Sequence, residues 1–561
     1  MLILAAYKQV TDPVSNSLFL SSIFAAIPLA VLFVLLGGLR LKAHIAALAA
    51  LLAAILVAVI VYSMPVGQAL DAGLEGATFG LFPIMWIVFT ALWIYHMTEA
   101  TGHFAVLRRS FAAIADDQRV QAVIIAFCFG ALLEALAGFG TPVAITAVML
   151  IAVGFQPMKA AAVALVANTA PVAFGAIAIP IVTLAGLTGL PQDDLGAMVG
   201  RQTPLLALFV PLILVGMVDG ARGIRQAWPA AVVGGLAFAV GQFVCSNYIS
   251  VELTDIVASL LSVASIVALT RVWHPTEPLR GEERTAGRRP AIAGAAAADS
   301  AFEDEVRRRE GNERDSAGDI WRAYAPYIII IAVFAIAQWG PIKTWLDGLT
   351  KEFDWPGLHI LNSKGKAPSS VTFKFNWANA AGTLLLVSGL LTMAVLRISP
   401  GRALRLFGET LAKLKWATLT VASVLALAYV MNGSAQTITI GSWIAGAGGV
   451  LGLLSPLIGW IGVAVTGSDT SSNSLFGVLQ VTAAKGAKLD PTLLAAANSS
   501  GGVLGKMISP QNLAIGAAAV GLGGQEGDLL RRVIGWSLIL LVVMCILVYL
   551  QTTSLLSWMV V

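Results

Sequence analysis

Two short polar segments interrupt long apolar stretches of this chain: residues 138–142, Gly-Phe-Gly-Thr-Pro, and residues 467–471, Gly-Ser-Asp-Thr-Ser. Counted from the threonine of each segment, the polar pairs at 168–169 and 498–499 begin 27 and 28 residues later. Non-helical backbone at membrane depth is tolerated only where it is buried in protein or lines a cavity. Paired breaks in corresponding halves of a chain indicate the binding site of a membrane transporter.

The composition indicates a helical membrane protein. Of 561 residues, 58% are hydrophobic and 12% are charged, whereas soluble proteins carry about 25% charged residues. Apolar runs of about 20 residues, the length that spans a bilayer as a helix, recur along the chain, and they lack the alternation of a barrel strand. The net charge of +4 gives no indication of nucleic-acid binding. Cys128, Cys245 and Cys545 lie in apolar runs without paired spacing, so we expect neither disulfides nor a metal site.

The apolar runs predict twelve membrane-spanning helices. They lie near residues 19–39, 44–63, 73–96, 160–190, 203–218, 228–245, 250–271, 324–340, 376–396, 416–431, 491–523 and 533–556. Two further apolar stretches, 120–155 and 452–485, contain the polar segments. Each is either one re-entrant hairpin or a pair of full spans, and hydropathy alone does not choose between them.

Arginine and lysine set the expected orientation, because they concentrate on cytoplasmic loops. Clusters that include Arg40, Arg109 and Arg531 follow the first and third expected helices and precede the last one. All clusters stay inside if the stretches 120–155 and 452–485 each cross the membrane an even number of times. Both chain ends then face outside, and the total is twelve helices with two hairpins, or up to 14–16 segments if the hairpins span fully.

This orientation gives the two halves of the chain opposite topology, since the first half starts outside and the second starts inside. Pro180 and Pro510 share the 330-residue offset of the polar pairs and support the correspondence. We therefore expect an all-α polytopic membrane protein, an inverted-repeat secondary transporter with two re-entrant hairpins and two broken helices. The expected divisions are 1–218, the first inverted repeat with hairpin 120–155 and broken helix 160–190; 219–272, a linking helix pair; 273–320, a flexible cytoplasmic loop of mixed charge; and 321–561, the second repeat with outer loop 341–375, hairpin 452–485 and broken helix 491–523.

The polar segments offer groups that suit a small hydroxycarboxylate. A helix broken at 138–142 exposes the N–H groups of the helix that follows, and this end carries partial positive charge that favours an anion. Side-chain hydroxyls and amides add neutral donors. The candidate substrate-binding residues are Gly140, Thr141, Asn168, Thr169, Ser468, Thr470, Ser471, Asn498 and Ser499. The alternative is that Gly, Ser and Thr only allow close helix packing, which is common in membranes.

Three ionisable residues lie within the apolar stretches, where a charge costs at least about 2.5–3.5 kcal/mol at the helix centre. Glu134 precedes the first polar segment, Asp469 lies inside the second, and Lys506 follows it. None has a charged counterpart at the corresponding position of the other half. Glu134 and Asp469 are the candidates for binding and releasing a proton, and Lys506 can hold a substrate carboxylate or neutralise Asp469. The alternative is a structural ion pair, or charges that lie near the membrane surface.

Several segments resemble a known family, the L-lactate permeases, which also carry glycolate. They are DQRVQAVIIAFCFGALLEALAGFGTPVAITA, VANTAPVAFGAIAIPI, VTGSDTSSNSLFGVLQVTAA and AANSSGGVLGKMISPQNLAI, with the shorter MVGRQTP and WPAAVVGG between them. The likeness covers most of the chain but not 273–320 or 341–370. It implies two hairpins and two broken helices that slide against a scaffold. By the same resemblance, the site residues are Glu134, Asn168, Thr169, Asp469, Thr470, Asn498, Lys506 and Ser509.

Together, residues and resemblance predict a multi-pass transporter of the bacterial inner membrane that imports L-lactate and related 2-hydroxymonocarboxylates, such as glycolate, with protons. The alternatives are sodium- or proton-coupled transport of another anion, such as a dicarboxylate, citrate or an oxyanion, or an anion channel. An enzyme is not expected, because the spans contain no nucleophile and base that converge. No cofactor is expected, and the proton is the coupling ion. The expected partners are a small carboxylate and the lipid bilayer, with no nucleic acid, and the sequence leaves the oligomeric state open.

Overall fold

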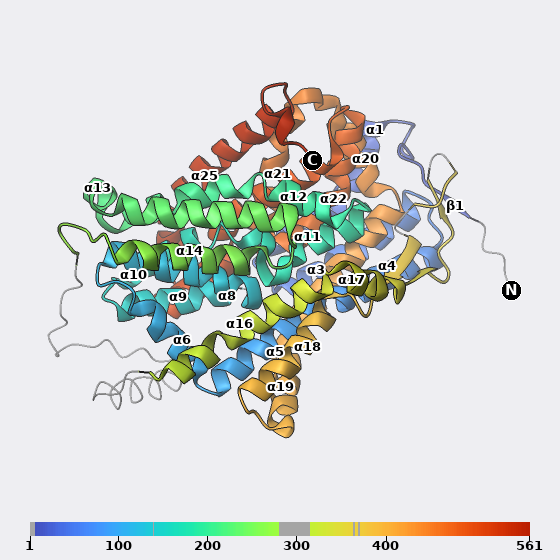
Figure 1. The fold of residues 1–561 in the computed structure, drawn as a ribbon. Helices are drawn as coiled ribbons and strands as arrows, with labels where there is room; N and C mark the ends of the chain where they lie inside the picture. Colours follow the sequence, from blue (N-terminus) through green and yellow to red (C-terminus); the bar gives the residue numbers. More distant parts are fainter. Residues whose placement is uncertain (1–5, 139, 280–314, 363–364, 369–370) are drawn as a thin grey trace.

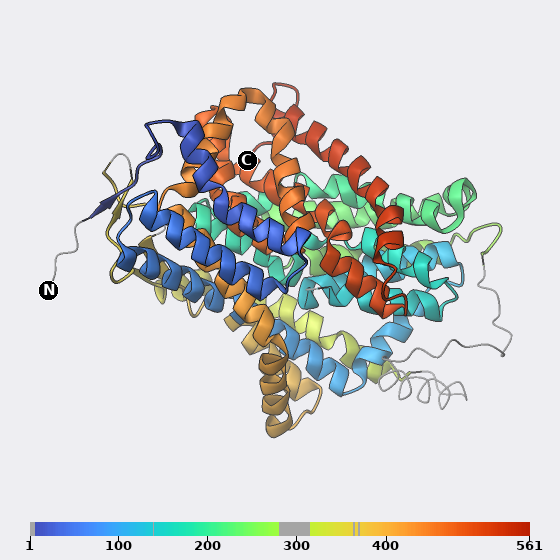
Figure 2. The ribbon, with the colours of Figure 1, turned by 180° about the vertical axis from the view of Figure 1, so that it is seen from behind.

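The computed structural model describes residues 6–138, 140–279, 315–362, 365–368 and 371–561. These residues form a bundle of helices with two small pairs of strands at one end (Figures 1 and 2). Within them, nine helices are long and apolar enough to cross a membrane. The prediction of an all-α polytopic membrane protein is confirmed. Phe139 of the first polar segment, and residues 280–314 of the expected cytoplasmic loop, lie outside the described residues.

The chain begins with a short strand and a series of apolar helices, in which η marks a short 3-10 or π segment. These elements are β1 (Tyr7–Lys8), α1 (Leu18–Ala25), α2 (Ile27–Phe33), η1 (Val34–Gly38), α3 (Ala43–Ile60), α4 (Val66–Phe79), η2 (Gly80–Met85), α5 (Trp86–Ala100) and α6 (His103–Ala112). The third expected helix, 73–96, is part of a longer run from α4 to α5. This run bends at η2, where Phe82 leaves the helical conformation just before Pro83.

The first polar segment and the first polar pair lie in the next series. Its elements are α7 (Gln118–Gln121), η3 (Ala122–Phe129), α8 (Gly130–Ala137), α9 (Thr141–Ala152), α10 (Pro157–Ala167), η4 (Val172–Phe174), α11 (Gly175–Thr188) and α12 (Gln192–Val199). α9 packs back against α8 and η3. α10 and the run from η4 to α11 are bent by 66° at the break between them.

The middle of the chain links the two polar segments. Its elements are α13 (Thr203–Tyr248), α14 (Thr254–Thr270), α16 (Ala317–Ala337), α17 (Gly340–Gly348), β2 (Lys351–Asp354), β3 (Ile360–Leu361), β4 (Thr372–Phe375) and α18 (Ala381–Val395). α13 contains both helices expected at 203–218 and 228–245. The backbone leaves the helical conformation between them, at Asp219 and Gly220.

The last series holds the second polar segment. Its elements are α19 (Pro400–Gly433), α20 (Gln436–Ile444), η6 (Ala445–Val450), α21 (Leu451–Thr466), α22 (Asp469–Gly486), α23 (Pro491–Gly505), η7 (Lys506–Ile508), α24 (Pro510–Ala519), α25 (Glu526–Gln551) and η8 (Ser557–Met559). The helix expected at 416–431 begins earlier than predicted, at Pro400. Residues 400–415 are helical, but they carry too many charged side chains for a search by hydropathy to include them. α20 is also missed, since it is only 9 residues long.

The two ends of the bundle carry different features. β1 pairs in parallel with β3, so the start of the described chain lies against the predicted outer loop, 341–375. At the opposite end, Arg109 forms an ion pair with Asp315, and Arg119 pairs with Asp117 and Asp219. Figure 1 shows β1 and α6 at these opposite ends. The predicted outer loop and these arginines therefore lie on opposite sides of the bundle.

Small residues allow the helices next to the second polar segment to touch through their backbones. A methyl group on Gly459 of α21 would overlap the backbone of Asn498 in α23, and one on Gly501 would overlap Pro456. Lipid provides no hydrophobic force between helices, so such close packing is a main source of their association. Close helix packing, the alternative role considered for small residues, therefore applies to Gly459 and Gly501.

Candidate functional site

The first polar segment separates α8 from α9. Gly140 precedes the first turn of α9 with φ +86°, a left-handed conformation that glycine adopts without steric cost. Pro142 lies in the first turn, where its fixed φ suits a helix and its missing N–H is not needed. Gly-Thr-Pro thus ends one helix and starts the next over very few residues. The N–H groups of Thr141 and Ala144 donate to the carbonyls of Gly138 and Gly140, each at 3.3 Å, and Pro142 has no N–H, so the first turn of α9 does not present the row of free donors expected from the sequence.

The second polar segment separates α21 from α22 in a similar way. Gly467 ends α21 with φ +75°. Ser468 caps α22 by accepting a hydrogen bond of 3.3 Å from the Ser471 N–H. Asn512 of α24 donates from Nδ2 to the Gly467 carbonyl at 3.3 Å. The turn is therefore tied both to its own helix and to the second broken helix.

The two broken helices differ in backbone conformation. Three consecutive residues at the start of α11, Ala176 to Ala178, have φ between 45° and 58°. The left-handed helical conformation costs roughly 1–2 kcal/mol per residue outside glycine. Such strain persists where the surrounding structure enforces it, often at functional sites. In the second broken helix, Ser509 ends η7 and caps α24 by accepting from the Asn512 N–H at 3.3 Å.

The breaks meet at one cavity of about 60 Å³. Its polar lining residues are Glu134, Ser468, Asp469, Thr470, Lys506 and Gln511. Gly138, Gly175 and Pro180 form part of the remaining wall. All three ionisable residues predicted from the sequence therefore line one cavity with residues of the second polar segment. The two halves of the chain contribute to it jointly.

Glu134 and Lys506 form a buried ion pair. Nζ of Lys506 lies 2.6 Å from Oε1 of Glu134, and the two side chains are 4% and 8% exposed. Asn168 donates from Nδ2 to Oε2 of the same carboxylate at 2.9 Å. A Cβ on Gly175 would lie 2.8 Å from Oε1, so only glycine leaves room for the carboxylate there. The ion-pair partner of Lys506 in this conformation is Glu134, whereas Asp469, the other acid considered as its partner, forms no ion pair with it among the described residues.

Asp469 lies at the first turn of α22 and is 3% exposed. Ser499 of α23 donates a short hydrogen bond to Oδ2 of Asp469. Oδ1 has no hydrogen-bond partner among the residues that the structure describes. A Cβ on Gly502 would overlap this oxygen. A buried carboxylate oxygen without a donor is costly, so Oδ1 is a position where a proton or a ligand would find a vacant acceptor.

Of the other predicted residues, some line the cavity and others lie outside its lining. Thr470 and Ser468 line the cavity. Asn498 lies outside the lining and donates to Oδ1 of Asn473 at 2.9 Å, while Thr169 donates to the Val166 carbonyl at 2.7 Å. Neither side chain lines the cavity. The cavity lining likewise omits Gly140, Thr141, Ser471 and Ser509.

Three polar residues next to the cavity were not predicted. Gln511 lines it directly. Asn512 holds Gly467, as described above, and Asn473 donates from Nδ2 to the Pro180 carbonyl at 3.0 Å, joining α22 to the break of α11. All three lie within ten residues of a predicted residue. A search for amides near the breaks, in addition to charges and hydroxyls, would have found them.

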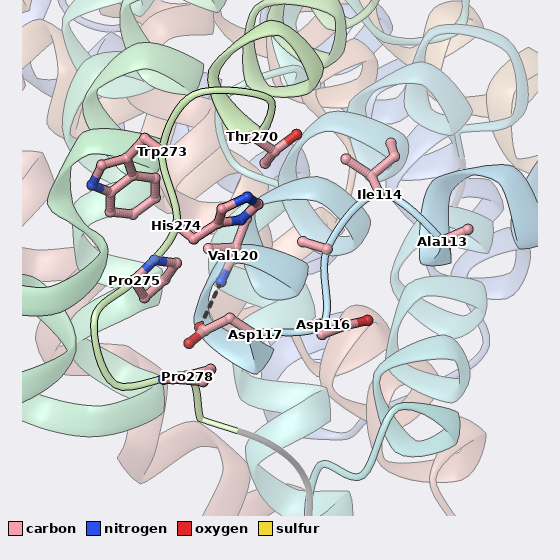
Figure 3. Close-up of a pocket in the computed structure, with 11 residues that line it drawn as sticks. Ala113, Ile114, Asp116, Asp117, Val120, Thr270, Trp273, His274, Pro275 and Pro278 are labelled. Carbon is pink, nitrogen blue, oxygen red and sulfur yellow. Dashed lines mark hydrogen bonds between the residues drawn. The ribbon is translucent and has the colours of Figure 1, made fainter.

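A larger cavity of about 300 Å³ lies elsewhere. Figure 3 shows Trp273, His274 and Pro275 on one side of it, and Ile114 and Asp116 on the other. It contains none of the predicted site residues. The smaller cavity is the better candidate, because it collects buried charges at broken helices.

Comparisons with known proteins show the family of the chain. A model of the L-lactate permease family matches residues 21–555. The chain is 40% identical to the L-lactate permease of Bacillus subtilis, over 99% of this chain and 100% of that protein. It is 41% identical to the glycolate permease GlcA of Escherichia coli, over 98% of each. Among solved structures it is similar to the antimetabolite efflux pump MtrF of Neisseria gonorrhoeae (TM-score 0.46, 15% identity, 87% of this chain and 84% of that chain) and to the YdaH transporter of Alcanivorax borkumensis (TM-score 0.40, 13% identity, 83% and 84%).

The apolar helices, broken around a small buried cavity, define a multi-pass membrane protein of the permease class. The chain belongs to the L-lactate permease family. Its relatives are bacterial, and the protein is a multi-pass component of the bacterial inner membrane. The family expected from the sequence segments is confirmed.

Proposed function

We propose that this protein is a proton-coupled secondary transporter that imports L-lactate and related 2-hydroxymonocarboxylates such as glycolate. Two relatives of about 40% identity are named as permeases of L-lactate and of glycolate. The observation that carries the proposal is the buried Glu134–Lys506 pair at the cavity. It supplies one cation for a carboxylate and one acid for a proton.

The size and lining of the cavity favour a small solute. Drug-sized ligands occupy sites of about 300–1,000 Å³, whereas this cavity measures about 60 Å³. Lys506 is the cation that lines it, so one carboxylate can be paired there. Ser468, Thr470 and Gln511 offer neutral hydrogen-bonding groups for an α-hydroxyl. A dicarboxylate or citrate would bring further negative charges with no matching cation in the lining.

Charge balance explains why a proton accompanies the anion. Lys506 is already neutralised by Glu134, so an entering carboxylate adds one unpaired negative charge. A charge left unpaired in a buried site costs several kcal/mol. One proton on Glu134 removes the excess, frees Lys506 for the substrate carboxylate and leaves Glu134, Lys506 and the substrate with no net charge between them. Asp469, with its unpartnered Oδ1, is the second carboxyl that takes part in proton binding.

The two halves act as an inverted repeat in this proposal. The α8–α9 and α21–α22 hairpins each pack next to a broken helix, α10–α11 and α23–α24, and their breaks share one cavity. Transporter sites of this type lie at the interface between repeats, where half-helix ends face the solute. The expected divisions 1–218 and 321–561, with the linking pair 219–272, belong to this proposal.

Uptake by proteoliposomes under an imposed pH gradient tests the proposed function. Labelled L-lactate should accumulate when the outside is acidic, stop with a protonophore, and be displaced by glycolate more strongly than by a dicarboxylate or citrate. Uptake that is unchanged by the protonophore but requires sodium would contradict proton coupling. Uptake that only equalises the lactate concentrations on the two sides of the membrane would indicate a channel. Liposomes without protein correct for passive entry of lactic acid.

A further inference from the structure

A third buried carboxyl lies beside the site but outside both polar segments. Asp255 is in the first turn of α14 and is 1% exposed. Gln242 of α13 donates from Nε2 to its Oδ1 at 3.1 Å. Its other oxygen, Oδ2, has no hydrogen-bond partner in the described parts of the chain. The charged form of such a group is strongly disfavoured without a cation or further donors.

Among the described residues, no cation is paired with Asp255. α14 packs against α13, α8, η3 and α11. The ionisable groups of these elements that interact with Asp255 are Glu134 of α8 and Cys245 of α13. Cys128 of η3 contacts Ser262, about two turns further along α14, and α11 has no ionisable residue. No described Lys, Arg or His forms an ion pair with Asp255, and the site residue that interacts with it electrostatically is another acid, Glu134.

Gln242 links Asp255 to the break of the first broken helix. The same Nε2 that donates to Asp255 also donates to the Ala170 carbonyl at 3.3 Å. Thr203 fixes the amide from its other side by donating to Oε1 of Gln242 at 3.1 Å. Ala170 follows the polar pair 168–169, whose Asn168 holds Glu134. This break is therefore bonded to Glu134 through the Asn168 side chain, and it is linked to Asp255 through Gln242, which bonds both the Ala170 carbonyl and Asp255.

We propose that Asp255 is a third proton-binding carboxyl of the transport cycle, a positioning residue that acts on Glu134 through Gln242 and the break at 168–170. In the conformation described here it holds a proton. When it releases the proton, the ionised carboxylate draws the Gln242 amide toward itself, because hydrogen bonds to ionised groups are shorter and roughly twice as strong. The longer bond to Ala170 is then lost, and the break that carries Asn168 is released. This inference rests on the proposed proton coupling.

The test compares two transport modes of one reconstituted protein. Asp255→Asn mimics the permanently protonated form. Lactate accumulation driven by a pH gradient should be lost, whereas exchange of internal for external lactate, which needs no net proton movement, should remain. Asp255→Glu should restore part of the accumulation. Glu252→Gln, a neighbouring acid bonded to Gln192 outside this network, is the matched control and should behave as wild type.

The outcomes separate this inference from the proposed function. If wild type shows no proton dependence, the proposed function fails. If wild type is proton-driven and Asp255→Asn accumulates lactate with the same pH profile, the inference about Asp255 is wrong. If Asp255→Asn does not fold, Gln242→Met leaves Asp255 in place and removes its link to Ala170. Wild-type accumulation and pH profile in folded Gln242→Met would equally overturn the inference.

Discussion

Lys506 donates a hydrogen bond of 2.6 Å to Oε1 of Glu134, and this buried pair joins residues 372 positions apart in the chain. It connects α8, before the first polar segment, to η7, in the second broken helix. Removal of one partner of a buried pair leaves the other charge uncompensated, at a cost of about 3–5 kcal/mol. A protonated Glu134 and a bound carboxylate together avoid this cost. The pair is therefore the structural basis of the coupling proposed above.

Glu134→Gln should separate exchange from accumulation. The amide mimics protonated Glu134, so it can release Lys506 for a substrate carboxylate but cannot carry a proton. Lactate exchange is expected to persist, while accumulation under a pH gradient is lost. Reconstituted protein assayed in both modes checks this. Accumulation at the wild-type level would remove Glu134 from the coupling mechanism.

Lys506→Gln should weaken substrate binding. The substitution removes the cation that lines the cavity beside Glu134. In wild type, lactate at about 100 times its Kd should stabilise the fold by about 2.7 kcal/mol, and this ligand-induced shift in Tm should be absent in the variant. Lys485→Gln, on the exposed end of α22, is the control and should keep the shift. An equal shift in Lys506→Gln would show that the carboxylate binds elsewhere.

Asp469→Asn should abolish coupled uptake, and Ser499→Ala should reduce it. Ser499 supplies the hydrogen bond to Oδ2 of Asp469, so its loss alters how readily that carboxyl takes up a proton. The measurement is the pH dependence of lactate uptake, which should move in Ser499→Ala relative to wild type. An unchanged pH profile in Ser499→Ala, together with normal uptake by Asp469→Asn, contradicts a role for this carboxyl.

Gly502→Ala should impair transport through Asp469. The added methyl group would overlap Oδ1 of Asp469, so the carboxyl or α23 must shift. Gly535→Ala in α25 is the matched control, because its methyl group would meet no atom within 4 Å. Alanine is favoured over glycine in a helix by about 1 kcal/mol. Uptake should fall in the first variant and be retained in the second; equal uptake in both would show that Oδ1 has no role.

Acid should destabilise the end of the bundle that holds Arg109 and Arg119, through Asp117, which caps α7. Burial by itself would raise the pKa of Asp117, but hydrogen bonds from Arg119 and the Leu279 N–H outweigh burial and hold the pKa below its usual value. The stabilisation is therefore present above the ordinary pKa of about 3.9 and is lost as pH falls through the lowered value. Asp117→Asn should cost about 3–5 kcal/mol at neutral pH, since it leaves buried Arg119 with fewer partners.

Thermal unfolding at several pH values checks the prediction for Asp117. The Tm difference between wild type and Asp117→Asn should shrink toward strongly acidic pH. Asp116→Asn, at an exposed neighbouring acid, is the control and should follow wild type. A constant Tm difference across the pH range would contradict the ionic origin of the stabilisation.

The sequence predicted the helical class, the breaks and the three charges of the cavity, because membrane depth penalises polar groups so strongly that each one is conspicuous. It could not predict that Lys506 pairs with Glu134 and not with Asp469. That choice depends on how α8 approaches η7 in three dimensions. The start of α19 and the existence of α20 were missed for a different reason, since hydropathy detects apolar length and not helicity. Asp255 was overlooked because a single acid near a helix start resembles an ordinary N-terminal residue.

Movement of protons with lactate tests the central claim most directly. Proteoliposomes with a trapped pH indicator, no imposed gradient and a sodium-free medium should acidify inside when L-lactate is added outside. The acidification should exceed that of protein-free liposomes, and this excess should be absent with Glu134→Gln. Labelled lactate entry without internal acidification, in the presence of functional protein, would contradict coupling to protons.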